Sequence, residues 1–91
     1  MPVKTVFLQV GGRVQGVGFR YFARHKAEEL KISGWVRNTP DGKIELEAEG
    51  ETQNLETFIG WMKIGPARAI IKTFAVSDIT PPRSFTNFTI R

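Results

Sequence analysis

The sequence predicts an α+β fold in which one β-sheet is covered on one face by two helices. In several short segments apolar and polar residues alternate, which is the period of a half-buried strand. Two other segments repeat apolar residues at the spacing of an amphipathic helix. These segments follow one another as β-α-β-β-α-β, with a short strand at the end. Two β-α-β halves with right-handed crossovers give an antiparallel sheet with both helices on one face, the ferredoxin-like sandwich.

Local signals set the expected element boundaries. Strands are expected over residues 5–10, 32–38, 43–49 and 69–79, helices over 20–30 and 52–64, and a short last strand around Phe88 and Ile90. Thr39-Pro40-Asp41-Gly42 predicts a tight hairpin turn, because Pro and Gly occupy favoured turn positions. Gly50 is expected to end the third strand, Thr52 is a candidate N-cap of the second helix, and Gly65-Pro66 should end that helix.

The composition limits the class of protein. The 91 residues support one domain, expected to span 1–91, and a hydrophobic content of 41% is enough for one core. The absence of cysteine excludes disulfides, thiolate catalysis and Cys-based zinc sites, and a single histidine excludes a His-rich metal site. The first ten residues contain no long apolar run, which argues against a signal peptide or a membrane span. The expected protein is a cytoplasmic monomer that uses no cofactor.

The formal net charge of +4 is unevenly placed along the chain. Residues 1–27 carry five bases and no acid, whereas residues 28–91 carry eight bases and nine acids. The excess positive charge therefore belongs to the segment that contains a Gly-rich stretch and the helix after it. This placement favours an anionic ligand. A solvated basic face explains the charge alone equally well.

The Gly-rich stretch from Gly11 to Arg20 reads GGRVQGVGFR and connects a predicted strand to a predicted helix. Glycine reaches positive φ without strain, so successive N–H groups can face one concavity, and the helix start adds further unpaired N–H groups. Arg20 in the first turn opposes the helix dipole at a cost of about 0.3–1 kcal/mol, unless an anion lies between it and the loop. We interpret the stretch as a phosphate site with a guanidinium clamp; a structural turn is the alternative for the glycines alone.

The remaining polar residues offer no obvious nucleophile or general base. His25 is interpreted as a surface residue, and Glu45, Glu47 and Glu49 as a solvated face of a strand. An acyl phosphate needs neither group, because its leaving group is a carboxylate. Charge neutralisation by an arginine and main-chain amides, with one held water, is enough for that reaction. Asn38, at the end of the second strand, has an amide that can orient such a water.

Two motifs together resemble the signature of the acylphosphatase family, and the similarity covers nearly the whole chain. They are Gly12-Arg13-Val14-Gln15-Gly16-Val17-Gly18-Phe19-Arg20 and Gly34-Trp35-Val36-Arg37-Asn38, with Asp41-Gly42, Gly50 and residues 65–69 as further landmarks. The resemblance implies metal-independent hydrolysis of the carboxyl–phosphate anhydride of acyl phosphates by a positioned water. It also implies that Arg20 binds the phosphate and that Asn38 positions the water. The residues that correspond to the phosphate cradle are Gln15, Gly16, Val17, Gly18 and Phe19. Inorganic phosphate or sulfate should then compete for the site.

The sequence leaves two alternative functions to consider. A ferredoxin-like sheet with a basic surface can bind RNA, but this requires exposed aromatic side chains and an RNP-type motif on the central strands. Phe7 is available, yet no such motif is present and the third strand carries glutamates, so no nucleic-acid partner is expected. A non-catalytic accessory domain of a larger carbamoyl-handling enzyme is the other alternative. Because the chain keeps both Arg20 and Asn38, an active enzyme is the favoured interpretation.

Overall fold

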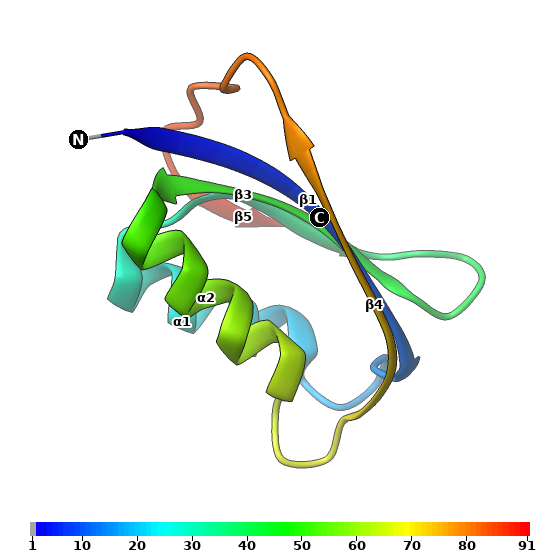
Figure 1. Ribbon diagram of the computed structural model, residues 1–91. Helices are drawn as coiled ribbons and strands as arrows, with labels where there is room; N and C mark the ends of the chain where they lie inside the picture. The colour runs from blue at the N-terminus through cyan, green and yellow to red at the C-terminus, as the bar shows by residue number, and fades with distance from the viewer. Residues whose placement is uncertain (1) are drawn as a thin grey trace.

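The computed structural model describes residues 2–91 and places both helices on one face of a five-stranded sheet (Figure 1). The strands are β1 (Val3–Arg13), β2 (Ser33–Asn38), β3 (Ile44–Glu51), β4 (Ile70–Ile79) and β5 (Phe88–Ile90), and the helices are α1 (Phe19–Leu30) and α2 (Thr52–Ile64). The predicted order of elements and the α+β sandwich are confirmed. Met1, the first residue of the expected domain, lies outside the described residues.

The strands lie in the order β4-β1-β3-β2-β5. The four strands of the predicted β-α-β-β-α-β unit pair antiparallel, as expected. The short β5 instead pairs parallel to β2, which makes the whole sheet mixed. The cause is the route of the chain, since β4 and β5 lie at opposite edges of the sheet and residues 80–87 connect them.

Two predicted boundaries around the end of β3 are wrong. Gly50 does not end the strand, because it pairs with Lys4 of β1 and β3 continues to Glu51. Thr52 is not the N-cap of α2, since it is already helical and Glu51 holds the cap position without a side-chain hydrogen bond. The strand thus passes directly into the helix. The C-terminal end of α2 is as predicted, with the Gly65 N–H donating to the Trp61 carbonyl at 2.9 Å.

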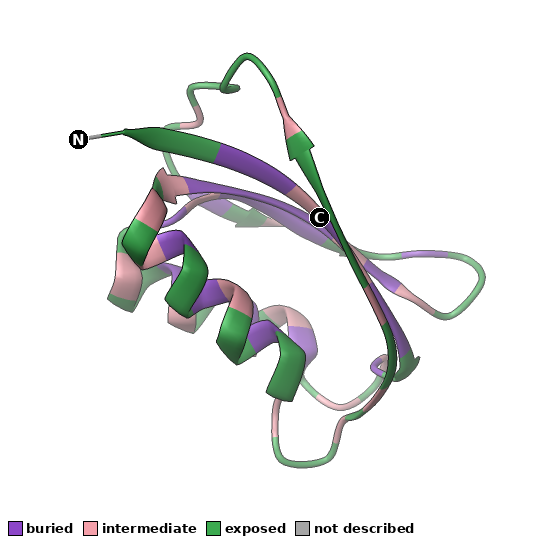
Figure 2. Cartoon of the chain, viewed as in Figure 1, coloured by how far each residue is buried: buried purple, intermediate pink, exposed green. Residues whose placement is uncertain are grey.

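The hydrophobic core lies between the sheet and the two helices. Figure 2 shows the buried faces of the helices turned toward the sheet, whereas the edge strand β4 is mostly exposed. The buried apolar side chains come from one face of each element and include Val6, Leu8, Val10, Phe19, Ala23, Ala27, Ile44, Leu46, Ala48, Leu55, Phe58 and Met62. Each large one stabilises the fold by roughly 1.5–3 kcal/mol relative to an exposed position. This core fixes the relative position of β1, α1 and β2.

The prediction of a solvated glutamate face on the opposite side of the sheet is wrong for two of its three residues. Glu47 and Glu49 are not solvated, since they are only 9% and 5% exposed. The connection between β4 and β5, which we call the strap (residues 80–87), passes over this face (Figure 1). Its Arg83 side chain pairs with Glu47 at 3.1 Å, and its main chain bonds to Glu49. Only Glu45 stays nearer the solvent, paired with Arg37.

No helix within residues 2–91 combines the length and the apolar character that crossing a membrane requires.

Gly34 of β2 supplies a test of the strand packing. Its φ is +144°, and a Cβ there would lie 1.9 Å from the main-chain oxygen of Glu47. We expect Gly34→Ala to lower the free energy of unfolding by about 2–5 kcal/mol, through backbone strain and overpacking. Gly60→Ala is the matched control, because a Cβ at Gly60 in α2 meets nothing within 4 Å and should stabilise the helix by about 0.5–1 kcal/mol. Urea unfolding of both variants measures the difference, and equal effects would contradict the packing described.

Candidate active site

The loop between β1 and α1 leaves a series of main-chain N–H groups open. Gly16 and Gly18 have φ of 73° and 81°, which turns the loop back toward the helix start. Gly18 is the N-cap of α1, and its carbonyl accepts the N–H of Phe22 at 3.0 Å. Within the described part of the chain, the N–H groups of residues 15–21 donate to no protein acceptor. Such a run of free donors at a helix N-terminus suits an anion.

Arg20 of α1 and Asn38 of β2 line one small cavity beside this loop. Its volume is about 120 Å³, and its lining comprises Val14, Gly16, Gly18, Phe19, Arg20, Tyr21 and Asn38. Arg20 is half-buried, whereas Asn38 is exposed at the end of its strand. The two residues singled out from the sequence therefore lie around the same hollow, although they are 18 positions apart along the chain. The size suits a phosphate group with a water better than a large ligand.

Among residues 2–91, the guanidinium of Arg20 has one protein acceptor. Its Nη1 donates to the main-chain oxygen of Arg91 at 3.3 Å, and the Arg91 N–H donates in turn to the Val36 carbonyl at 2.8 Å. The first of these bonds is long and exposed, so it is weak. An anion in the cavity can therefore take over donors of Arg20 at little cost. Until an anion binds, the main-chain oxygen of Arg91, the residue after β5, holds the guanidinium near the cavity.

The predicted cradle residues divide into two groups in the structure. Gly16, Gly18 and Phe19 line the cavity, but Gln15 and Val17 do not. The amide nitrogen of Gln15 donates to the carbonyls of Thr39 at 2.8 Å and Lys43 at 2.9 Å. Its side chain therefore ties the loop to the hairpin between β2 and β3. The side chains of Val17 and Phe19 pack on or within the core, so the cradle itself is main chain.

Sequence reasoning missed the part that the hairpin plays. Thr39 is buried, its hydroxyl accepts the Lys43 N–H at 3.0 Å, and it also bonds to Asp41. This hydroxyl bond is the main cause that lowers the pKa of the Asp41 carboxyl. The hairpin directly follows Asn38 and presents the carbonyls that Gln15 binds. A turn signal was visible in the sequence, but nothing in it paired the turn with Gln15.

The charge in residues 1–27 is only partly near the cavity. Lys4 forms an ion pair with Asp78 at 3.5 Å, and the Lys26 ammonium lies 3.8 Å from the centre of the Trp61 ring. Those two cations are engaged elsewhere. The Arg24 guanidinium lies 5.5 Å from the ring centre of Tyr21, a cavity residue that the sequence did not single out. Arg20 and Arg24 therefore supply the positive charge at this end of α1.

His25 is exposed on α1, 3.9 Å from Glu29, so its interpretation as a surface residue is confirmed.

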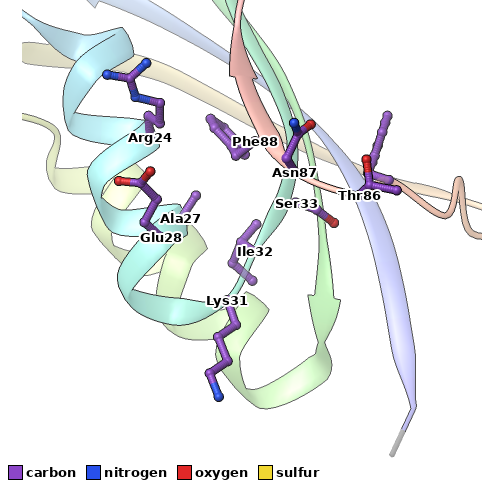
Figure 3. Close-up of a pocket in the computed structure, with 10 residues that line it drawn as sticks. Arg24, Ala27, Glu28, Lys31, Ile32, Ser33, Thr86, Asn87 and Phe88 are labelled. Atoms are coloured by element: carbon purple, nitrogen blue, oxygen red, sulfur yellow. The ribbon is translucent and has the colours of Figure 1, made fainter.

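A larger hollow of about 620 Å³ lies farther along α1, between the helix and the strap (Figure 3). Figure 3 shows Arg24, Ala27 and Glu28 on the helix and Ser33, Asn87 and Phe88 across from them. Neither Arg20 nor Asn38 lines it, and its side chains carry both signs of charge. Cavity size alone would therefore select the larger hollow and not the cavity beside the loop amides. The smaller cavity remains the candidate site, because the free donors and the arginine meet there.

The fold and this cavity define the class of the protein, a small α+β sandwich with its candidate site at a strand-to-helix loop. The family model for acylphosphatase matches residues 6–90. The acylphosphatase of Methylococcus capsulatus is 41% identical over 88 residues, covering 97% of this chain and 96% of that protein.

Solved structures agree with the family match. The acylphosphatase from Bacillus subtilis superposes with a TM-score of 0.93 at 35% identity, covering 97% of this chain and 98% of that one. The acylphosphatase from Coxiella burnetii gives a TM-score of 0.93 at 35% identity, with 98% and 93% covered. The chain belongs to the acylphosphatase family, enzymes that hydrolyse acyl phosphates.

The tether made by Gln15 can be tested through stability. We expect Gln15→Ala to lower the free energy of unfolding by about 1–2 kcal/mol, since two hydrogen bonds of the side chain are lost. Gln53→Ala, at an exposed position of α2, is the matched control and should change stability by less than about 0.5 kcal/mol. Urea unfolding measures both. If the two variants unfold alike, the side chain of Gln15 does not hold the loop.

Proposed function

We propose that this acylphosphatase hydrolyses its substrate without a metal, by direct attack of a water held at the cavity between Arg20 and Asn38. The observation that carries the proposal is the meeting of three kinds of group at one small hollow. They are the free N–H groups of residues 15–21, the guanidinium of Arg20 and the side-chain amide of Asn38. Together they can neutralise a phosphoryl group and orient a water, and they include neither a nucleophile nor a general base.

In the proposed mechanism the phosphoryl oxygens lie against the loop. Arg20 offers paired, charge-assisted hydrogen bonds, and the loop amides add fixed dipoles that need no rearrangement during the reaction. The side-chain amide of Asn38 can accept a hydrogen bond from the attacking water and can donate one to it. These bonds align the water oxygen with phosphorus. As the new P–O bond forms, the bond to the acyl oxygen breaks and its electron pair leaves with the carboxylate. The water proton passes to a phosphate oxygen or to solvent.

Inorganic phosphate and sulfate are proposed to compete for the same loop, since they offer the same oxygens as the substrate. The proposed state is a cytoplasmic monomer. The cysteine-free sequence suits a reducing compartment. Sedimentation equilibrium is the measurement that would reveal a larger assembly.

No nucleic-acid partner is proposed. An RNA-binding sheet of this architecture stacks bases on aromatic side chains of its open face. Here the strap covers that face over β3, where Glu47 and Glu49 are buried beneath it. Phe7 is half-buried on the neighbouring strand. Sub-micromolar RNA binding at physiological salt that survives Arg20→Ala would overturn this part of the proposal.

The first test of the mechanism uses chelation. Hydrolysis of benzoyl phosphate should continue at an unchanged rate in excess EDTA, because the proposed stabilisation comes from Arg20 and main-chain amides. The steady-state rate is measured with and without EDTA, and again after Mg²⁺ is added back. Loss of turnover in EDTA and its return with the metal would contradict the proposal.

The second test separates the roles of Arg20 and Asn38. Arg20→Ala should weaken competitive phosphate binding by tenfold or more and lower turnover as well, since charge-assisted bonds are worth about 1.5–3 kcal/mol each. Arg20→Lys should rescue poorly, because a point charge cannot replace the fork. Asn38→Ala should leave phosphate binding near wild type while kcat falls by about 10²–10³.

Arg68→Ala, at an exposed position, controls for the loss of a positive charge, and thermal melts of every variant control for folding. An unchanged kcat in folded Asn38→Ala would contradict the division of roles. So would an Asn38→Ala phosphate inhibition constant that rises as far as that of Arg20→Ala.

A further inference from the structure

Glu49 is a buried carboxylate on the face of the sheet opposite the helices, and the proposed mechanism does not use it. It is 5% exposed. Its two oxygens accept hydrogen bonds from the Ser84 N–H at 3.0 Å, from the Phe85 N–H at 2.9 Å and from the hydroxyl of Thr5. The Arg83 N–H donates to the Thr5 oxygen at 3.3 Å, so β1 and β3 hold the strap jointly. An acceptor-only group is required at this position, because every partner is a donor.

The strap leads from Glu49 to the candidate site in a short series of contacts. The residue that ends it, Asn87, accepts the Gly34 N–H of β2 at 2.8 Å. β5 follows immediately and pairs with β2 from Gly34 to Val36, two residues before Asn38. The next residue, Arg91, bonds to Val36 through its N–H and to the Arg20 guanidinium through its carbonyl. The strap thus leads directly into β5, which pairs with β2 up to two residues before Asn38, and the residue after β5 contacts Arg20.

We propose that Glu49 is a positioning residue for the phosphate site, which holds the strap so that β5 braces β2 and keeps the Arg91 carbonyl against Arg20. The activity part of this inference rests on the proposed function, whereas its structural part does not. The strap has no regular secondary structure of its own, and Glu49 supplies two of the hydrogen bonds that hold its main chain to the sheet. Removing the carboxylate should therefore loosen β5 before it loosens the core strands.

The charge of Glu49 gives the inference a pH signature. The ionisable groups that face it are Glu47 and Glu51, two positions away along β3, and Arg83 of the strap, while β1 and β2 present only the hydroxyls of Thr5 and Ser33. Burial raises the pKa of Glu49, but the hydrogen bonds from Thr5 and from main-chain N–H groups of the strap outweigh it and hold the pKa below its usual value. A lowered pKa in the folded state means that the carboxylate stabilises the strap above its unfolded pKa. That stabilisation is lost as the pH falls through the folded pKa.

The test compares Glu49→Gln with Glu51→Gln, which removes the same charge from an exposed position of the same strand. At neutral pH, amide hydrogen exchange at Thr89 of β5 and at Arg91, whose N–H bonds to Val36, should become about ten- to a hundredfold faster in Glu49→Gln, while Leu46 in the core strand stays protected. The kcat/KM for benzoyl phosphate should fall about tenfold or more in the same variant. Glu51→Gln should match wild type in both measurements.

The ratio of wild-type to Glu49→Gln kcat/KM is then followed with pH, since the titration of the substrate cancels in the ratio. It should be constant near neutral pH and approach one as acid protonates Glu49 in the wild type. Thr5→Val removes one donor to Glu49 and the acceptor of the Arg83 N–H, so it should show the same local exchange pattern, and it serves if Glu49→Gln fails to fold.

Exchange at β5 that rises no more than exchange at Leu46 would overturn the inference, because Glu49 would then support only global stability. A kcat/KM ratio that stays constant into acid would overturn it as well. An inactive wild-type enzyme would instead contradict the proposed function, and the exchange comparison would still decide the structural role of Glu49.

Discussion

The proposed site depends on a set of main-chain N–H groups that have no protein acceptor within residues 2–91. Residues 15–21 run from a strand through a positive-φ turn into a helix, so their amides cannot join either hydrogen-bond pattern. Unpaired donors cost free energy unless solvent or a ligand meets them. The surrounding chain holds them in place, through Gln15 on the hairpin side and the buried Phe19 on the core side. In the proposed function, these free donors are where the phosphate oxygens bind.

β2 is the element through which the other parts reach this loop. It carries Asn38 at its end, and it borders β3 on one side and β5 on the other. The strap brings β5 to that edge and brings the Arg91 carbonyl to Arg20. A small sandwich without cysteine thus places the two proposed functional side chains, from separate elements, around one cavity of about 120 Å³. Packing on the core fixes the position of α1, and pairing with β3 and β5 fixes the position of β2.

Much of this could be predicted from the sequence, because its signals are local. Alternation and helical spacing located the elements, and the Gly-rich stretch with Arg20 and Asn38 located the cavity. The predictions that failed concern contacts between residues that are distant in the sequence. Alternation indicated that Glu47 and Glu49 face away from the helices, but it could not indicate that residues 35 and 36 positions later cover them. The tether of Gln15 to the hairpin was hidden for the same reason, since partners distant in sequence leave no periodic signal.

The most direct test of the account is a titration of ¹⁵N-labelled protein with inorganic phosphate, followed by NMR against sodium chloride of matched ionic strength. We expect saturable shifts at the amides of residues 16–20 and at the side-chain Nε of Arg20. The residues that line the larger hollow, including Arg24 and Asn87, should show no shift. In Arg20→Ala the loop shifts should need far more phosphate to saturate. Shifts confined to the larger hollow, or a loop that responds equally to chloride, would contradict the account.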